Sequence, residues 1–254
     1  MMQASLQYPL AILFAFFITL AVNGVSTGNP IQTPATPPQS LHQQLNNAPS
    51  VRLHIMLKGK NMQIHGQSVF DVFAKPVISA DPTSVRYDGF ATFIQGDSKF
   101  TYMVVDGSAY VVESTGDDTT SVATRTVRCL SSITPFDSIV DTLNNLKTVS
   151  TETGGDDSEV DCNKGSLYET SFGGKHFMVC APGADGFIAY GGDITMVVEY
   201  LDSPLTSLST PNLTDGSVSC PAVVKPTSVS PTTVAFLIGK EAPPTCASLE
   251  SDWI

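Results

Sequence analysis

The sequence predicts a mainly β (α+β) protein, in which a curved antiparallel sheet or half-barrel packs on one amphipathic helix. Three observations support this fold class. Many segments alternate apolar and polar residues with the period of two that strands have, and short turn signals separate them. A single segment has the period of a helix instead. A Pro/Ser/Thr-rich segment follows the strand-forming region.

The first 26 residues have the pattern of a secretory signal peptide. The apolar run from Pro9 to Val22 is shorter than the roughly 20 residues that span a membrane, and the small residues Gly24 and Ser26 follow it. No Lys or Arg precedes the run, so an uncleaved anchor is the alternative. We expect a signal peptide over residues 1–26 and a secreted, extracellular protein without stable membrane insertion.

The net charge of −11 narrows the classes of partner. A strongly acidic chain has no general attraction for nucleic acid or for an anionic membrane surface. We therefore expect no nucleic-acid partner, and either an unidentified protein or an apolar small molecule as the partner.

A β-rich domain is expected over residues 51–202. Residues 27–50 before it are rich in Pro and Gln without apolar periodicity, which predicts an extended linker. Alternation from Val51 to Leu57 predicts a strand with one buried face. The pair Asp106-Gly107 is a signal for a two-residue hairpin turn. Further strands are expected at 84–94, 100–104, 109–113, 119–128, 166–172, 175–181, 186–190 and 194–200.

One segment changes to helical spacing. Its apolar residues recur at i, i+3, i+4, i+7 and i+10 from Phe136 to Leu146, which predicts one amphipathic helix over residues 135–147. Thr134 suits the N-cap and Pro135 the first helical position. No other segment of the expected mature chain gives a clear helical pattern.

The composition shifts after Asp202. Residues 203–254 are rich in Ser, Thr and Pro, and they form the predicted C-terminal segment. The apolar run Val234–Ile238 suits a strand along the edge of the domain, because the neighbouring prolines argue against a central strand. Asn212 begins the sequence Asn-Leu-Thr, which is an acceptor site for an N-linked glycan in an exported eukaryotic protein.

Five cysteines indicate disulfides in an exported protein, with one thiol left over. Closeness in sequence favours the pairs Cys162–Cys180 and Cys220–Cys246, which leaves Cys129 unpaired. A bridge between Cys129 and Cys162 is the alternative. No two cysteines have C-x2-C spacing, which argues against a structural zinc site.

The stretch Thr170–Asp193 contains three glycine clusters, for which a phosphate-binding loop is one interpretation. A Walker loop requires Ser or Thr after its Gly-Lys pair, but His176 follows Gly174-Lys175. A dinucleotide fingerprint leads into a helix, whereas strand patterns flank these glycines. Gly173-Gly174 instead suits a hairpin turn. The stretch therefore predicts turns between strands and not a phosphate site.

Other catalytic and metal-binding signatures fail as well. Neither G-x-S-x-G nor H-E-x-x-H occurs. His54 and His65 fall on adjacent strands, so a two-histidine metal site is an alternative to two exposed histidines. The acidic stretch 156–161 lacks the order of a calcium loop and favours a solvated loop. We expect no catalytic residue, no cofactor and no metal; a carboxylate-based hydrolase is a second alternative because such enzymes have no short motif.

A pocket is expected if the concave face of the sheet is wider than the helix that covers it. Carriers of bacterial lipoproteins are similar in layout, an analogy at the level of the fold alone. The residues expected to line such an apolar pocket are Phe90, Phe93, Phe100, Phe177 and Met196.

Two classes of function follow. The sequence favours a secreted, acidic, disulfide-containing binding or interaction protein without catalytic activity, because every catalytic signature fails while the export signals agree. The alternative is a carrier of an apolar or lipid-like ligand in a pocket between sheet and helix.

Overall fold

A computed structural model describes residues 40–116, 124–134, 136–149, 160, 162, 165–206 and 208–240. The predicted signal peptide, the acidic stretch 156–161 except residue 160, and Cys246 lie outside the described residues. No helix in the described part of the chain is both long and apolar enough to span a membrane.

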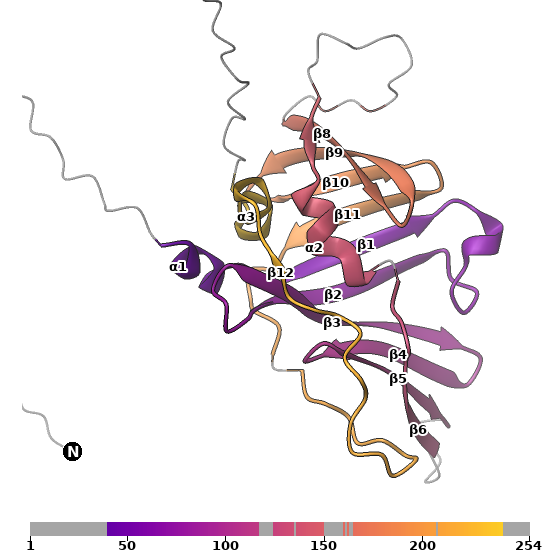
Figure 1. Ribbon diagram of the computed structural model, residues 1–254. Coiled ribbons are helices and arrows are strands. Elements are labelled where there is room, and N and C mark those ends of the chain that lie inside the picture. The colour runs from indigo at the N-terminus through magenta and orange to yellow at the C-terminus, as the bar shows by residue number, and fades with distance from the viewer. Residues whose placement is uncertain are drawn as a thin grey trace, which may run out of the picture. The chain divides into compact units, whose positions relative to one another are not determined.

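The strands form one antiparallel, open sheet that curls around a concave face (Figure 1). Their order is β6-β5-β4-β3-β2-β1-β11-β10-β9-β8-β7, and β12 pairs with β3 off this path. The prediction of a mainly β, antiparallel fold is confirmed. The strands are β1 (Val51–Leu57), β2 (Val69–Ile78), β3 (Ser84–Gln95), β4 (Ser98–Val105), β5 (Ser108–Thr115), β6 (Thr124–Cys129), β7 (Lys147–Thr148), β8 (Ser166–Phe172), β9 (Lys175–Gly183), β10 (Gly186–Gly191), β11 (Ile194–Tyr200) and β12 (Thr227–Ser228).

Strand β1 joins the two halves of the sheet. It pairs with β2 on one side and with β11 on the other. Its alternation follows the prediction, since Val51, Leu53 and Ile55 are buried while the residues between them are partly exposed. Successive side chains of a strand point to opposite faces, so these three residues mark the concave side.

Two-residue turns join β4 to β5 and β8 to β9. Asp106 and Gly107 both have positive φ, as do Gly173 and Gly174, and each pair lies between two antiparallel strands. Positive φ at both central residues is the requirement of the two-residue hairpin turn. The glycine-rich stretch Thr170–Asp193 therefore forms turns and strands of the sheet, as its sequence predicts.

The helices lie on or beside the concave face (Figure 1). They are α1 (Leu41–Asn46), α2 (Ile139–Asn144) and α3 (Pro231–Ile238), with two short 3-10 helices, η1 (Lys60–Met62) and η2 (Phe136–Ser138). The predicted helix 135–147 is therefore too long. It begins with the 3-10 turn of η2 and ends at Asn144, because Lys147 and Thr148 pair with β8.

Helix α1 lies in the segment predicted as a linker, and that part of the prediction is wrong. Ser40 and Gln43 form a reciprocal capping box, in which the backbone N–H of each residue donates to the side chain of the other. Leu45 anchors the helix, since it is 2% exposed and belongs to the same core cluster as α3 residues.

Helix α3 replaces the predicted edge strand at Val234–Ile238, and that prediction is also wrong. Ser230 caps it by accepting a hydrogen bond from the Thr233 backbone N–H, Pro231 occupies the first turn, and Gly239 ends it with a φ of 67°. Five consecutive residues, Thr233–Leu237, are buried. A helix that is buried on all sides shows an apolar run instead of a helical period, which is why it resembles a strand in sequence.

The segment between β11 and α3 packs against the opposite, outer face of β4–β6. Tyr110, Val112 and Val127 form a small buried cluster there with Cys220. The backbone N–H groups of Val223 and Val224 donate to the Gly107 carbonyl. The C-terminal segment is thus an ordered strap over its described residues.

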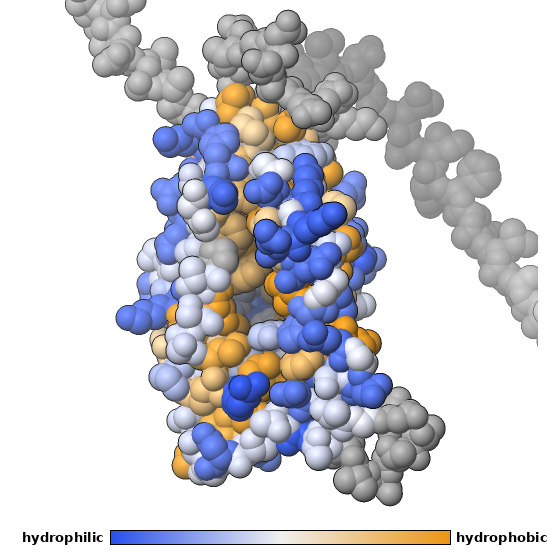
Figure 2. Space-filling model, turned by 90° about the vertical axis from the view of Figure 1, so that its right-hand side faces the viewer, coloured by the Kyte–Doolittle hydropathy of each residue, from blue (hydrophilic) through white to orange (hydrophobic). Residues whose placement is uncertain are grey.

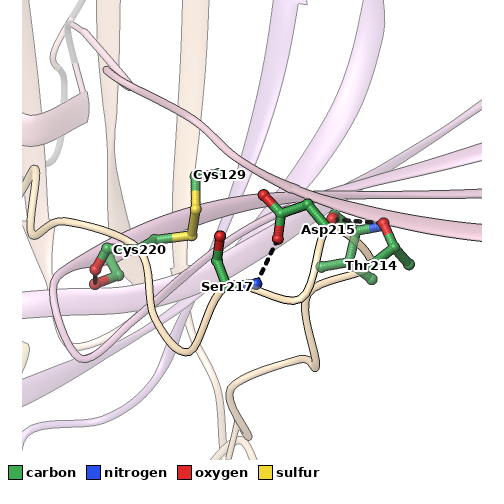
Figure 3. The surroundings of a disulfide bond; sticks show 7 residues. Cys129, Thr214, Asp215, Ser217 and Cys220 are labelled. Atoms are coloured by element: carbon green, nitrogen blue, oxygen red, sulfur yellow. Dashed lines mark hydrogen bonds between the residues drawn. A yellow bond between two sulfur atoms is a disulfide. The ribbon is translucent and has the colours of Figure 1, made fainter.

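Two disulfides cross-link the described residues. Cys162 bonds to Cys180, the pair that closeness in sequence favours. Cys220 bonds to Cys129, 91 residues away, so the predicted Cys220–Cys246 pair and the unpaired Cys129 are both wrong (Figure 3). Cys220 bonds to Cys129 because the strap runs back along β6 and places Cys220 beside the end of that strand.

We expect removal of the Cys129–Cys220 bond to destabilise the fold more than removal of Cys162–Cys180. In the chain-entropy description, a 91-residue separation corresponds to about 4 to 5 kcal/mol and an 18-residue separation to about 3 kcal/mol. Denaturant unfolding of C129S/C220S and of the matched C162S/C180S variant measures both losses. Equal losses, or non-reducing peptide mapping that links Cys220 to Cys246, would contradict this assignment.

Candidate functional site

A cavity of about 420 Å³ lies between the concave face of the sheet and α2. Its described wall comes from the inward positions of β1–β4 and β8–β11, from α2 with η2, and from residues 130–134. Phe236 of α3 contributes to it as well. None of the described lining residues carries a charged side chain. Figure 2 faces the side where the β1–β2, β3–β4 and β10–β11 turns lie, and it shows a hollow framed by apolar residues.

Small residues at inward positions leave this space unfilled. Ala74, Gly89 and Ala91 are neighbours on β2 and β3 and face the cavity, as does Ala189 on β10. A Cβ at Gly89 would lie 2.5 Å from the Phe73 carbonyl oxygen, so the close pairing of β2 and β3 demands glycine there. Interiors normally pack with few voids larger than a water molecule, so a cavity of this size is a feature that needs an explanation.

Three of the predicted pocket residues line the cavity from the inner face. These are Phe93, Phe177 and Met196. Phe90 also borders it, but the odd separation from Phe93 places its ring on the outer face, where it stacks on Phe73 at 5.5 Å between ring centroids.

Phe100 is not among the lining residues. Its ring stacks on His65, with 4.0 Å between the ring centroids. His65 has a positive φ of 49°, and its Nε2 lies 2.8 Å from the Tyr102 hydroxyl while its Nδ1 lies 2.9 Å from Gln95 Oε1. Tyr102 lines the cavity, so this cluster supports one part of the cavity wall.

Helix α2 is fixed over the cavity by contacts with β8. The Thr170 hydroxyl donates to the Thr142 carbonyl oxygen at 2.9 Å, and the Thr142 hydroxyl reaches the Ser171 carbonyl at 3.4 Å. Val140 and Leu143 are the buried residues of the helix. Leu143 faces the cavity, so α2 serves as its cover.

Asn144 joins α2 to the start of α3. Its Nδ2 donates to the Ser228 carbonyl at 2.7 Å, and its Oδ1 accepts from the Ser230 backbone N–H at 2.8 Å and from the Thr233 hydroxyl at 2.6 Å. Thr233 is fully buried. These three bonds hold α2, which covers the cavity, against the start of α3.

A cluster of charged residues on the outer face is the other candidate site. Asp71 accepts hydrogen bonds from Arg52 Nη2 at 2.9 Å and pairs with His54 Nδ1 at 2.8 Å, and Glu199 lies 3.3 Å from Arg52 Nη1. Partial burial tends to raise the pKa of Asp71, but the hydrogen bonds from Arg52 and His54 outweigh it and hold that pKa below its usual value.

This cluster does not have the composition of a catalytic site. A nucleophilic site needs a hydroxyl or thiol within hydrogen-bond reach of the histidine, and among the described residues His54 has only Asp71 as a hydrogen-bond partner. His54 and His65 have different partners, so the hypothesis of a shared metal site has no support in the geometry. Within the described ranges, no group of three or more His, Cys, Asp or Glu residues is arranged to hold a metal ion. The cluster fits a surface ion-pair network.

Many lining residues lie outside the set predicted from the sequence, and several of them are aromatic. Strand alternation alone places Tyr87 and Phe187 on the buried face, so that signal could have found them. Phe236 lies on α3, which the sequence predicts as an edge strand, so no pattern assigns it to the cavity. The lining aromatic residues outside the predicted set are Tyr87, Tyr102, Phe136, Phe172, Phe187, Tyr200 and Phe236, with Phe70 on β2.

Comparisons of the chain with protein-family models, with curated proteins and with solved structures found no match. The functional argument therefore depends on the geometry of the site.

We expect Asn144→Ala to destabilise the protein by about 2 to 4 kcal/mol, because it leaves the buried Thr233 hydroxyl and the Ser230 N–H without their acceptor. Asn145→Ala is the matched control. The side chain of Asn145 donates a hydrogen bond to the Asp141 carbonyl at an exposed position. Loss of this bond should lower the free energy of unfolding by less than about 1 kcal/mol. Urea unfolding of both variants measures the difference, and similar losses would show that Asn144 does not join the two helices.

Proposed function

We propose that this protein binds an apolar ligand in the cavity under α2. The observation that carries the proposal is the cavity itself, because the described residues that line it are mostly apolar and none carries a charged side chain. Its volume of about 420 Å³ falls within the range of roughly 300–1,000 Å³ that is usual for ligand pockets. This makes the carrier hypothesis the better of the two that the sequence leaves open.

The energetics favour a long apolar chain as the ligand. Each methylene group that leaves water contributes about 0.8 kcal/mol, while association costs at least about 4 kcal/mol. A chain on the order of ten carbons or more therefore binds stably, and a small apolar molecule does not.

Binding of a protein partner has less support. The exposed large apolar side chains of the described residues are Val69, Ile94 and Val218. A protein interface of standard size buries about 800 Å² on each partner. Three such side chains are too few to form the apolar centre of an interface of that size.

We also propose that the protein is exported. Its two disulfides are of the kind that persists in oxidising compartments, and the acceptor residue Asn212 is exposed on the strap. The leader-like pattern of residues 1–26 supports the same proposal.

We expect cultured eukaryotic cells to secrete the chain without its first 26 or so residues and with one glycan at Asn212. Intact mass before and after treatment with an N-glycosidase measures both changes, and Asn212→Gln should remove the glycan. Asn145→Gln, outside any acceptor sequence, is the control. Retention in the cell with the leader attached would contradict export.

We expect Ala91→Phe to weaken the binding of a fluorescent long-chain alcohol at least tenfold, because the larger side chain occupies the cavity. Thr92→Phe adds the same ring on the opposite face of β3 and should change the affinity less than about twofold. Fluorescence titration measures both, with circular dichroism as the check on folding. An equal effect of the two variants would place the ligand elsewhere, and no binding by the unaltered protein would reject the proposed function.

A further inference from the structure

We propose that the ligand is uncharged and carries a hydrogen-bond acceptor, which the hydroxyl of Tyr87 binds inside the cavity. This inference rests on the function proposed above and names the chemical class of its ligand. The class is a neutral amphiphile with one long apolar chain, such as a ketone, an ester or an alcohol.

The hydroxyl of Tyr87 differs from the other hydroxyls that line the cavity. Tyr87 has no hydrogen-bond partner among the residues that the structure describes, whereas each of the others has one. Their partners are His65 Nε2 for Tyr102 (2.8 Å), Asp137 Oδ2 for Thr134 (3.3 Å), Thr134 Oγ1 for Ser132 (2.8 Å), the Ser171 carbonyl for Thr142 (3.4 Å), the Thr142 carbonyl for Thr170 (2.9 Å) and the Phe236 carbonyl for Tyr200 (2.5 Å).

The position of Tyr87 makes its hydroxyl available to a ligand. Tyr87 lies on the inward side of β3 with Ala91 and Phe93, and it packs against both core clusters that meet around the cavity. Tyr87 is partly buried, and its hydroxyl is not among the fully buried, unpaired polar atoms of the described residues, so it keeps accessible surface in the cavity. A pure hydrocarbon that covered this hydroxyl would leave it without a partner, whereas a ligand with an acceptor would bond to it, so the cavity selects the second kind of ligand.

Tyr87 acts as a donor. Burial raises the pKa of Tyr87 well above its usual value, and the nearby Tyr200 raises it further. The phenol is therefore protonated at neutral pH, and its O–H can donate to an acceptor such as a carbonyl oxygen.

The described wall excludes charged ligands from the same position. Among the described residues, no Lys, Arg or His lines the cavity to pair with a carboxylate, and no Asp or Glu lines it to pair with an amine. The free-energy cost of burying an unpaired charge in apolar surroundings is far larger than the stabilisation from one hydrogen bond. The acceptor is therefore part of a neutral group.

The strand geometry gives the orientation of the ligand. Tyr87 lies six residues before Phe93 on β3, which is a span of about 20 Å along the strand. Phe93 is close to the β3–β4 turn, on the side where Figure 2 shows the hollow, and Tyr87 is close to β12 and α3. The polar group therefore enters first, and the apolar chain extends from Tyr87 towards the hollow.

The test compares three chain-matched probes in competition with a fluorescent long-chain alcohol. They are hexadecane, the methyl ketone of the same length and hexadecanoate at pH 8. The measured quantity is the ratio of ketone affinity to hexadecane affinity, which cancels the contribution of the chain. We expect this ratio to fall about five- to tenfold in Tyr87→Phe. It should not change in the control Tyr190→Phe, which removes a hydroxyl from the outer face of β10, outside the described lining of the cavity.

Each outcome decides one question. Binding of hexadecane and ketone with an unchanged ratio in Tyr87→Phe would overturn the role of Tyr87 and leave the proposed function intact. Hexadecanoate binding as tight as the ketone would overturn the restriction to neutral ligands. Failure of all three probes to displace the fluorescent alcohol would reject the proposed function itself.

A spectroscopic measurement tests the same contact without a variant. The carbonyl stretch of the ketone moves to lower frequency when the oxygen accepts a hydrogen bond. We expect the infrared band of the bound, isotope-labelled ketone to lie below its position in hexadecane. A band at the same position as in hexadecane would overturn the inference even if Tyr87→Phe does not fold.

Discussion

The pairing of β1 with both β2 and β11 is the constraint on which the rest of the structure depends. It joins two antiparallel halves into one sheet, and the twist of that sheet produces a concave face. A six-residue helix such as α2 is only about 9 Å long, so it covers part of this face and leaves space beneath it. The cavity follows from this mismatch in size, and the small residues at Gly89 and Ala91 enlarge it.

The C-terminal strap limits that space at one end. It leaves the sheet after β11, packs on the outer face where Cys220 bonds to Cys129, and returns as β12 and α3. Helix α3 then fills the end of the concave face next to α1. Asn144 bonds to the Ser228 carbonyl, the Ser230 N–H and the Thr233 hydroxyl, and this polar network favours one arrangement of α2 and α3.

The sequence predicts those parts of the fold that local patterns determine. Alternation identifies strands such as β1, and glycine pairs identify the turns. Helix α3 and the Cys129–Cys220 bond are not predicted, because both depend on packing between distant parts of the chain. A helix that is buried on all sides has no polar face to show its period, and a contact over 91 residues depends on the path of the strap, which the sequence of neither cysteine reveals. Phe90 shows a related limit, because apolar character alone does not say which face of the sheet a residue occupies.

The candidate site raises the question of whether the cavity is a packing defect or a binding site. Larger side chains would fill a packing defect, and Ala91 and Ala189 are small residues that face this space. At Gly89 the close approach of β2 requires glycine. A packing defect also gives no reason for a lone polar group inside it. The other lining hydroxyls of the described wall are bonded within the protein, whereas Tyr87 presents a donor to an otherwise apolar space. Strand alternation places Tyr87 on the inner face, but only the arrangement of its neighbours shows that its hydroxyl is left for a ligand.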